Sequence, residues 1–288
     1  MTKTQATALG FGAVLMWALL AVLTVKAMSI PPFQLTAMSF AVGGALGLVW
    51  VFLAGEAQSL KTVSWNIYAF GTVGLFGYHF FYFSALRLAP AAEAGLIAYL
   101  WPLLIVFFSG LLPGEQLKAG HIIGGLIGFA GAALIVTQGG TRFEASAALG
   151  YGLALLCAVT WSSYSVISRR LGQVPTSSVA VFCLATAALS GVAHLGFEDT
   201  VWPIELTVWL AVIGLGVGPV GLAFFVWDVG VKRGDIQLLG VASYAAPLLS
   251  TFVLVIVGIA DMTWALLGAS VLITLGAVLA ARASKSDA

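Results

Sequence analysis

The sequence predicts an all-α membrane protein with ten transmembrane helices, and two observations support that prediction. The 23 charged residues divide the chain of 288 residues into ten charge-free stretches of 20 to 29 residues each, and a helix needs about 20 apolar residues to cross the hydrocarbon core of a bilayer. Only 8% of the residues are charged and 61% are hydrophobic, whereas about 25% of the residues in an ordinary soluble domain are charged. The predicted spans are residues 4–25, 27–55, 62–86, 94–114, 119–141, 145–168, 171–197, 206–227, 236–260 and 262–281.

The distribution of basic residues predicts the orientation of these spans. The first apolar run follows Lys3 and has no small-residue cleavage site, so it is interpreted as a retained first helix. Cytoplasmic connections of membrane proteins carry an excess of Lys and Arg. Three basic residues fall on one side of the membrane and the other nine fall on the opposite side. The side with nine is predicted to be cytoplasmic, and both termini lie on it. The prediction is therefore a multi-pass protein of the inner (plasma) membrane with both termini cytoplasmic. The three are Lys26, Arg87 and Arg142; the nine are Lys3, Lys61, Lys118, Arg169, Arg170, Lys232, Arg233, Arg282 and Lys285.

An internal repeat predicts two five-helix units, residues 1–141 and 142–288. Residues 9–12 read LGFG and residues 149–152 read LGYG. A longer match pairs Gly95, Tyr99 and Pro102 of the fourth predicted span with Gly240, Tyr244 and Pro247 of the ninth, at an offset of 145 residues. Because five spans are an odd number, the second unit enters the membrane from the opposite side. Inverted repeats of this kind are typical of transporters that expose a midplane site to each side in turn.

Several motifs resemble the EamA-type repeat of the drug/metabolite transporter superfamily. Residues 87–97 read RLAPAAEAGLI, residues 99–102 read YLWP and residues 114–117 read GEQL, followed by a Gly-rich span. The second repeat is more degenerate, since Ala260-Asp261 stands where the Gly-Glu pair is expected. The resemblance covers nearly the whole chain and implies a ten-helix exporter. The aromatic content further resembles the branch of aromatic amino acid exporters.

The third predicted span contains the first candidate site residues. Tyr78, His79 and Tyr82 lie near its middle at spacings of three and four residues, so they share one helix face. A histidine at that depth is unfavourable against lipid, and ionisable groups inside a membrane usually face the bundle interior or a wet cavity. A hydrogen bond from a neutral imidazole to a neighbouring helix is the alternative interpretation.

The fourth and ninth spans add a repeated stripe with a helix breaker. Tyr99 and Tyr244 are candidate cavity-lining residues, with Trp101 and Ser243 beside them. Proline removes a backbone hydrogen bond and kinks a helix. Two kinks at repeat-equivalent positions suit a moving pair of half-helices, although kinks that only improve packing remain the alternative. Pro102 and Pro247 are therefore predicted as hinge or gating residues.

The sixth span is unusually polar. Trp161, Tyr164 and Ser165 share a face that combines aromatic rings with a hydroxyl group, as ligand sites commonly do. Helix packing by small residues is an equally good interpretation. Trp17 and Trp227 are predicted to complete the pocket.

Charged residues contribute little to the predicted midplane. Asp228 and Lys232, four residues apart, are interpreted as a structural or gating ion pair, and Glu93 with Arg87 as a loop ion pair. His79 is the one ionisable candidate deep in a span. Proton coupling and facilitated diffusion down a cytoplasmic gradient are therefore both open.

Together these observations predict an exporter of aromatic and other hydrophobic amino acids such as Phe, Trp, Tyr and Met, working by alternating access around an aromatic-lined cavity. The alternatives are export of hydrophobic drugs or organic cations, and a non-transport membrane sensor or scaffold. The sequence lacks a phosphate-binding loop and a midspan partner for His79, so neither ATP hydrolysis nor intramembrane catalysis is expected. No cofactor, metal, nucleic acid or obligatory ATPase subunit is expected; the partners are the substrate and the lipid bilayer.

Overall fold

The structure is a computed structural model that describes residues 1–138 and 140–285. Regular secondary structure in these residues is entirely helical, which confirms the all-α prediction. The elements are α1 (Lys3–Trp17), α2 (Leu20–Lys26), α3 (Pro32–Leu53), α4 (Ala57–Lys61), α5 (Trp65–Leu88), α6 (Ala91–Ala98), α7 (Trp101–Ser109), α8 (Ala119–Thr137), η1 (Ala145–Ala147), α9 (Ala148–Arg170), α10 (Ser178–Phe197), α11 (Leu206–Val217), η2 (Gly218–Leu222), α12 (Ala223–Arg233), α13 (Ile236–Ala242), α14 (Ala245–Ile256) and α15 (Trp264–Lys285).

Nine helical segments in the described residues are long and apolar enough to cross a membrane. The chain is therefore a multi-pass membrane protein. The predicted third span coincides with α5, which has 24 residues and is long enough to cross a membrane. The helix α5 is not among the nine, because its polar, aromatic and glycine residues lower its mean hydropathy. The nine are Lys3–Lys26, Pro32–Leu53, Ala91–Ser109, Ala119–Thr137, Ala145–Arg170, Ser178–Phe197, Leu206–Arg233, Ile236–Ile256 and Trp264–Lys285.

Four of these segments are interrupted near their middle. The fourth span breaks between α6 and α7, and the ninth between α13 and α14, a few residues before Pro102 and Pro247 respectively. A proline is tolerated in the first turn of a helix because the N–H groups there have no intrahelical partner. The sequence analysis missed two further interruptions, the break between α1 and α2 and the π-helix η2, which contains Pro219.

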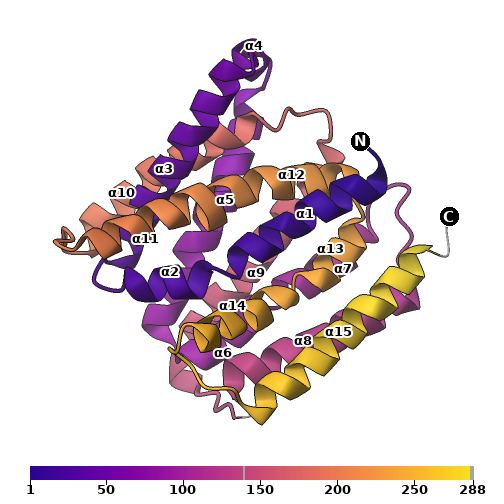
Figure 1. The fold of residues 1–288 in the computed structure, drawn as a ribbon. Helices are drawn as coiled ribbons and strands as arrows, with labels where there is room; N and C mark the ends of the chain where they lie inside the picture. The colour runs from indigo at the N-terminus through magenta and orange to yellow at the C-terminus, as the bar shows by residue number, and fades with distance from the viewer. Residues whose placement is uncertain (139, 286–288) are drawn as a thin grey trace.

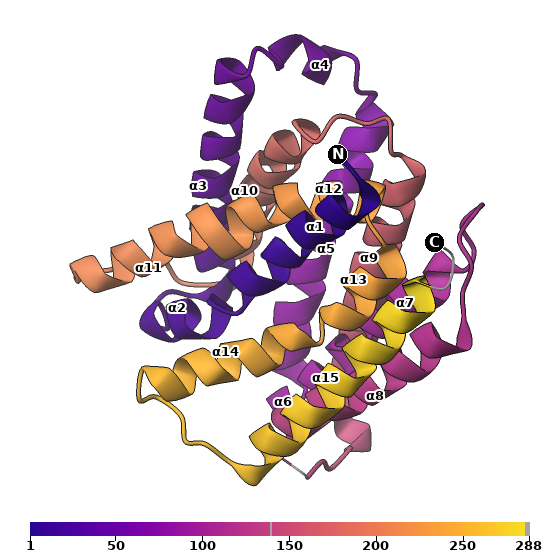
Figure 2. The ribbon, with the colours of Figure 1, turned by 45° about the vertical axis from the view of Figure 1, so that its right-hand side comes forward.

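Glycines let neighbouring helices approach at backbone distance. The helices α8 and α15 run side by side in both views (Figures 1 and 2). A Cβ atom added at Gly124 of α8 would lie 2.5 Å from the carbonyl oxygen of Gly276 in α15. Close approach of this kind holds helices together in a membrane, where the hydrophobic effect does not drive helix association.

The molecule has two ends that differ in their connections. The start of α1 and the end of α15 lie on the same side of the ribbon (Figures 1 and 2). Lys3, at the start of α1, forms an ion pair of 3.3 Å with Asp235, which precedes α13. We call the end of the molecule that contains the start of α1 and the end of α15 the closed end. The connection between α2 and α3, residues 27–31, lies at the opposite end, which we call the open end.

Asp235 predicts a pH dependence of stability. Burial raises the pKa of this carboxyl, but the hydrogen bond from the Leu238 amide and the Lys3 ammonium outweigh burial, so the pKa in the folded protein lies below its ordinary value. A depressed pKa contributes stability that is present above the unfolded pKa of about 3.9 and lost as the pH falls through the folded pKa. We expect Asp235→Asn to lower the thermal unfolding midpoint at pH 7 and to reduce its decline below pH 4. If scanning calorimetry gave Asp235→Asn the same pH dependence of the unfolding midpoint as the wild type, the depressed pKa of Asp235 would be contradicted.

Candidate functional site

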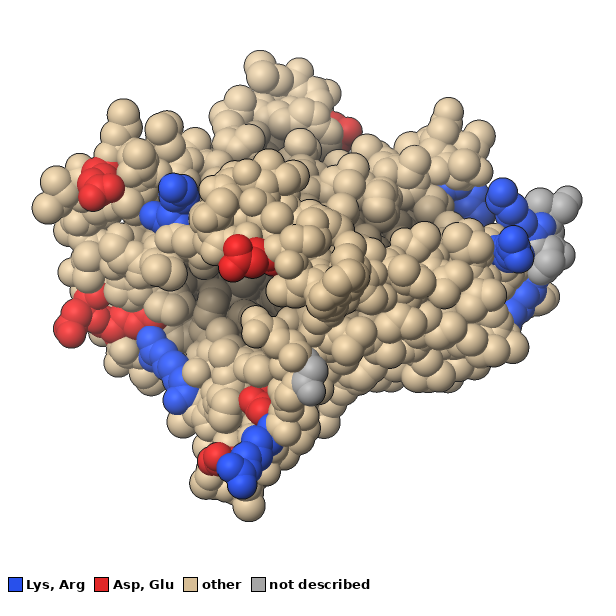
Figure 3. Space-filling model, turned by 60° about the horizontal axis from the view of Figure 1, so that its bottom comes forward, with Lys and Arg blue, Asp and Glu red and all other residues tan. Residues whose placement is uncertain are grey.

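A cavity of about 550 Å³ lies among the interrupted helices. It opens at the open end, where residues of the α2–α3 connection line it, and Figure 3 shows the hollow on this face with acidic and basic side chains spaced around it. Its described lining contains no Asp, Glu, Lys or Arg side chain. The lining residues are Trp17, Leu20, Ala21, Thr24, Ala27, Met28, Ile30, Pro32, Leu35, Thr36, Ser39, Phe40, Tyr78, His79, Tyr82, Phe83, Ala98, Tyr99, Trp101, Trp161, Leu215, Pro219, Val220, Phe224, Ala246 and Ser250.

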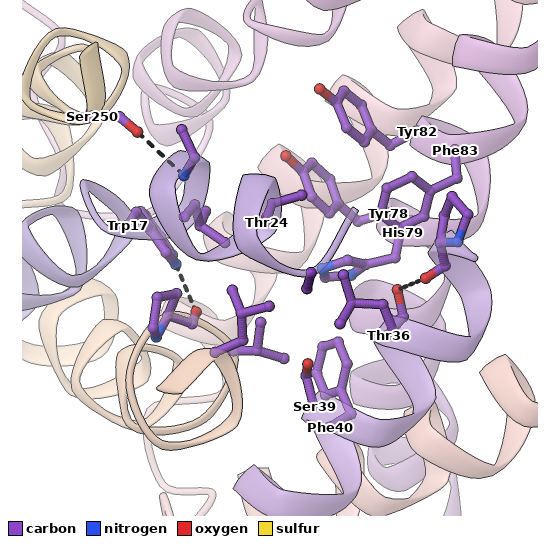
Figure 4. Close-up of a pocket in the computed structure, with 18 of the residues that line it drawn as sticks. Trp17, Thr24, Thr36, Ser39, Phe40, Tyr78, His79, Tyr82, Phe83 and Ser250 are labelled. Atoms are coloured by element: carbon purple, nitrogen blue, oxygen red, sulfur yellow. Dashed lines mark hydrogen bonds between the residues drawn. The ribbon is translucent and has the colours of Figure 1, made fainter. Parts of the chain in front are cut away.

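Tryptophan rings form the floor of this cavity. The Trp17 ring lies 6.0 Å from both the Trp101 and the Trp161 ring, in edge-to-face contact with each. Its indole Nε1–H donates to the carbonyl of Pro219 in η2 at 3.1 Å (Figure 4). All three rings are less than 10% exposed. The floor therefore separates the cavity from the closed end and offers ring edges and faces to a ligand.

His79 faces this cavity from α5 (Figure 4). Its Nδ1 lies 2.8 Å from the carbonyl oxygen of Leu75, one turn earlier in the same helix. A carbonyl only accepts, so Nδ1 carries the hydrogen and Nε2 of the neutral ring is left as an acceptor. The ring also packs edge-on against Phe40 with centroids 5.0 Å apart.

Hydroxyl groups form a second wall that the sequence analysis missed. Thr24 comes from α2, Thr36 and Ser39 come from α3 and Ser250 comes from α14 (Figure 4). The Thr36 hydroxyl donates to the Pro32 carbonyl at 2.7 Å. Ser39 is 1% exposed, and its hydroxyl has no hydrogen-bond partner among the described residues. The spacing of Thr36 and Ser39, three residues apart, was the available signal, since it places both on one face of a helix.

The predicted site residues fall into two groups. Seven of them line the cavity: Trp17, Tyr78, His79, Tyr82, Tyr99, Trp101 and Trp161. Five do not, and their side chains pack between helices instead: Tyr164, Ser165, Trp227, Ser243 and Tyr244.

The second group has local packing reasons for its positions. The Trp227 indole donates to the Ser165 hydroxyl at 3.1 Å behind the floor, and the Ser243 hydroxyl donates back to its own helix at Leu239, at 2.7 Å. Tyr244 turns toward α8, where Gly128 leaves room for its ring. The two repeat-equivalent tyrosines therefore differ, because Tyr99 faces the cavity.

A polar network holds the closed end together. Arg169 of α9 donates from Nη1 to the carbonyls of Val231 and Gly234, both at 2.9 Å, and from Nη2 to Glu115. We call these contacts the Arg169 latch. They join α9 to the α7–α8 connection and to the end of α12.

An ion pair lies in the same end. Asp228 and Lys232 approach to 2.8 Å with side chains 2% and 5% exposed, and Thr176 donates to the carboxylate at 2.7 Å. This confirms the predicted pair.

At the open end, the carboxylate of Glu198 lies in a cluster of hydrogen-bond donors at the start of α3. Glu198 accepts a hydrogen bond from Arg87 at 2.7 Å and from the backbone N–H of Phe33 at 3.0 Å. The predicted pair of Arg87 with Glu93 is therefore wrong, and Glu93 instead accepts from the Arg142 amide at 2.6 Å. The unpaired N–H groups at a helix start attract a carboxylate. Glu198 directly follows the end of α10, and from there its carboxylate reaches the N–H groups at the start of α3.

Interrupted spans around an open cavity are typical of membrane transport proteins. The EamA-like transporter family matches residues 5–137 and 148–282, and the chain belongs to this family. A relative from Ancylobacter novellus, described as an aromatic amino acid exporter YddG, is 53% identical over 97% of this chain and 98% of its own.

Two relatives of lower identity and one solved structure are also similar to this chain. A protein of the same description from Salmonella typhimurium is 24% identical over 97% of both chains, and a riboflavin transporter from Vibrio cholerae is 24% identical over 65% of this chain. One solved crystal structure superposes with a TM-score of 0.93 at 53% identity, covering 97% of this chain and 98% of its own.

Proposed function

We propose that this protein exports aromatic and other bulky hydrophobic amino acids across the inner membrane. The observation that supports this most is the combination of a tryptophan floor with hydroxyl groups in a cavity without fixed charge. A substrate with an aromatic side chain gains ring contacts from Trp101 and Trp161. A zwitterion has no net charge, but its ammonium and its carboxylate each need hydrogen-bonding partners when they leave water.

The lining supplies those partners. His79 Nε2 is an acceptor, and the hydroxyls of Thr24, Ser39 and Tyr99 both donate and accept. Export of organic cations is less well supported, because none of the lining residues is a carboxylate. The name of the Ancylobacter novellus relative favours the same substrate class.

The proposed topology has ten spans in two inverted repeats with cytoplasmic termini. It treats α5 as the third span, and the two matches of the family to this chain support the repeat. The closed end then faces the cytoplasm, and the cavity is open to the outside. Alternating access requires the Arg169 latch to separate and the open end to close, with the breaks before Pro102 and Pro247 as the proposed hinges.

Transport in liposomes tests this proposal. We expect the purified protein to move labelled phenylalanine and tryptophan down their gradients, and Trp101→Ala to weaken apparent affinity about tenfold through lost ring contacts. Trp264→Ala is the control, since Trp264 is 88% exposed. Flux that appears only with a pH gradient, and is lost in His79→Ala, would assign proton coupling to His79. Absence of flux for both amino acids in liposomes with folded protein would refute the substrate assignment.

A further inference from the structure

Ser250 of α14 lies where two interrupted spans meet at the wall of the cavity. It lines the cavity together with Ala246, one turn earlier in the same helix. Its hydroxyl oxygen accepts a hydrogen bond from the backbone N–H of Ala21 in α2, at 3.4 Å (Figure 4). This side chain therefore joins the first span to the ninth span inside the candidate site.

The break between α1 and α2 explains why the Ala21 amide needs a partner. Ala21 is the second residue of α2, and the side chain of Leu19, which precedes the helix, makes no cap. The N–H groups in the first turn of a helix have no intrahelical partner. The Ser250 oxygen supplies an acceptor for one of them, from a segment 229 residues away in the sequence.

The hydrogen of the Ser250 hydroxyl stays available to the cavity. A serine hydroxyl has one hydrogen to donate, and accepting a hydrogen bond from Ala21 does not use it. The neighbouring Thr251 differs, because its hydroxyl donates to the Pro247 carbonyl of the same helix at 2.9 Å. Among the described residues, the Ser250 hydroxyl hydrogen has no acceptor. Ser250 is therefore a free donor at the cavity wall, whereas Thr251 is not.

The first repeat has no hydroxyl group at the equivalent position. At the repeat offset of 145 residues, Ile105 of α7 corresponds to Ser250, as Pro102 corresponds to Pro247. Ile105 is fully buried in the hydrophobic core. A hydroxyl here is therefore not a general requirement of the repeat, and the contact with α2 and a contact with the substrate are the two roles to be separated.

We propose that the Ser250 hydroxyl donates a hydrogen bond to the α-carboxylate of the transported amino acid. This inference rests on the proposed function, and it assigns the group that distinguishes an amino acid from its decarboxylated amine. A carboxylate only accepts hydrogen bonds, and none of the lining residues is Lys or Arg, so it depends on neutral donors. Ser250 and Trp17 lie on the same side of the cavity, opposite Tyr78 and Tyr82 (Figure 4). A carboxylate at Ser250 is therefore close to the tryptophan floor that receives the substrate side chain.

Substrate competition in liposomes tests this inference. Inhibition of labelled tryptophan transport is measured with phenylalanine and with 2-phenylethylamine, which lacks the carboxylate. We expect the wild type to prefer phenylalanine, and Ser250→Ala to lose about tenfold or more of that preference, as for one hydrogen bond to a charged group. Thr251→Ala is the matched control, because its hydroxyl bonds within α14, and is expected to keep the preference. Ser250→Thr retains a hydroxyl and is expected to keep it as well.

The outcomes separate substrate binding from a structural contact. Equal weakening of both competitors in Ser250→Ala would show that the hydroxyl only holds α2 to α14, and would overturn the inference. An unchanged preference in Ser250→Ala, or a wild type that binds both competitors equally, would also overturn it while the proposed function stands. Should Ser250→Ala fail to fold, Ser250→Cys, whose thiol is a weak donor, is expected to lose the same preference. A wild type that transports neither tryptophan nor phenylalanine would refute the proposed function itself, and the inference with it.

Discussion

Substitution of Gly124 by leucine is expected to prevent accumulation of folded protein. The Cβ atom would lie 2.5 Å from the Gly276 carbonyl oxygen and 3.2 Å from the Ala280 amide nitrogen, so the backbones of α8 and α15 have to separate. Overpacking of this kind costs about 1–3 kcal/mol even where flexible side chains absorb it, and here backbone atoms cannot yield.

The yield of monodisperse protein after detergent extraction measures this effect. Gly152→Leu is the matched control, since nothing lies within 4 Å of a Cβ atom at that glycine. Normal yield and thermal stability of Gly124→Leu would show that the α8–α15 contact is not a close packing interface in the membrane.

Removal of the Arg169 side chain is expected to have the next largest effect. Arg169→Ala leaves Glu115 without its partner at a largely buried position and removes the donor from the Val231 and Gly234 carbonyls. Breaking a buried ion pair by removing one partner costs about 3–5 kcal/mol. We expect a lower thermal midpoint and a shift of the population toward an opened closed end.

A cysteine probe measures that shift. Ser168→Cys places a thiol at a position that is 5% exposed beside the latch, and the natural Cys157 and Cys183 are buried. Labelling of this thiol by a water-soluble maleimide is expected to accelerate about a hundredfold in Arg169→Ala. Arg170→Ala, which removes the neighbouring exposed charge, is the control and is expected to label as slowly as the probe variant alone. Equal rates in all three proteins would contradict the latch.

Helix positions were predictable because charges avoid the hydrocarbon core. All ten predicted stretches overlap a helix of the structure. The last predicted stretch, residues 262–281, begins two residues before α15 (Trp264–Lys285) and ends four residues before it does. Interruptions were predictable only where a proline repeats, as at Pro102 and Pro247. The π-helix η2 contains a proline without a repeat partner and was missed.

The candidate site was predictable in part for a related reason. A helical stripe shows which residues share a face, but it does not show whether that face meets the cavity or another helix. Tyr99 and Tyr244 occupy equivalent positions in the repeat, yet only Tyr99 lines the cavity. Gly128 on a neighbouring helix decides the matter, because it makes room for the Tyr244 ring. Such a choice depends on contacts between distant segments, which spacing along one helix does not encode.

Protection of a cavity thiol by substrate tests the central claim most directly. Thr24→Cys places a thiol on α2 in the cavity wall, and Ser146→Cys in the exposed η1 provides a control thiol outside it. In right-side-out vesicles, both thiols are expected to react with a membrane-impermeant maleimide. Tryptophan and phenylalanine, but not glycine, are expected to slow the reaction of Thr24→Cys alone. Labelling of Thr24→Cys that is insensitive to aromatic amino acids at saturating concentration would contradict the assignment of this cavity as their binding site.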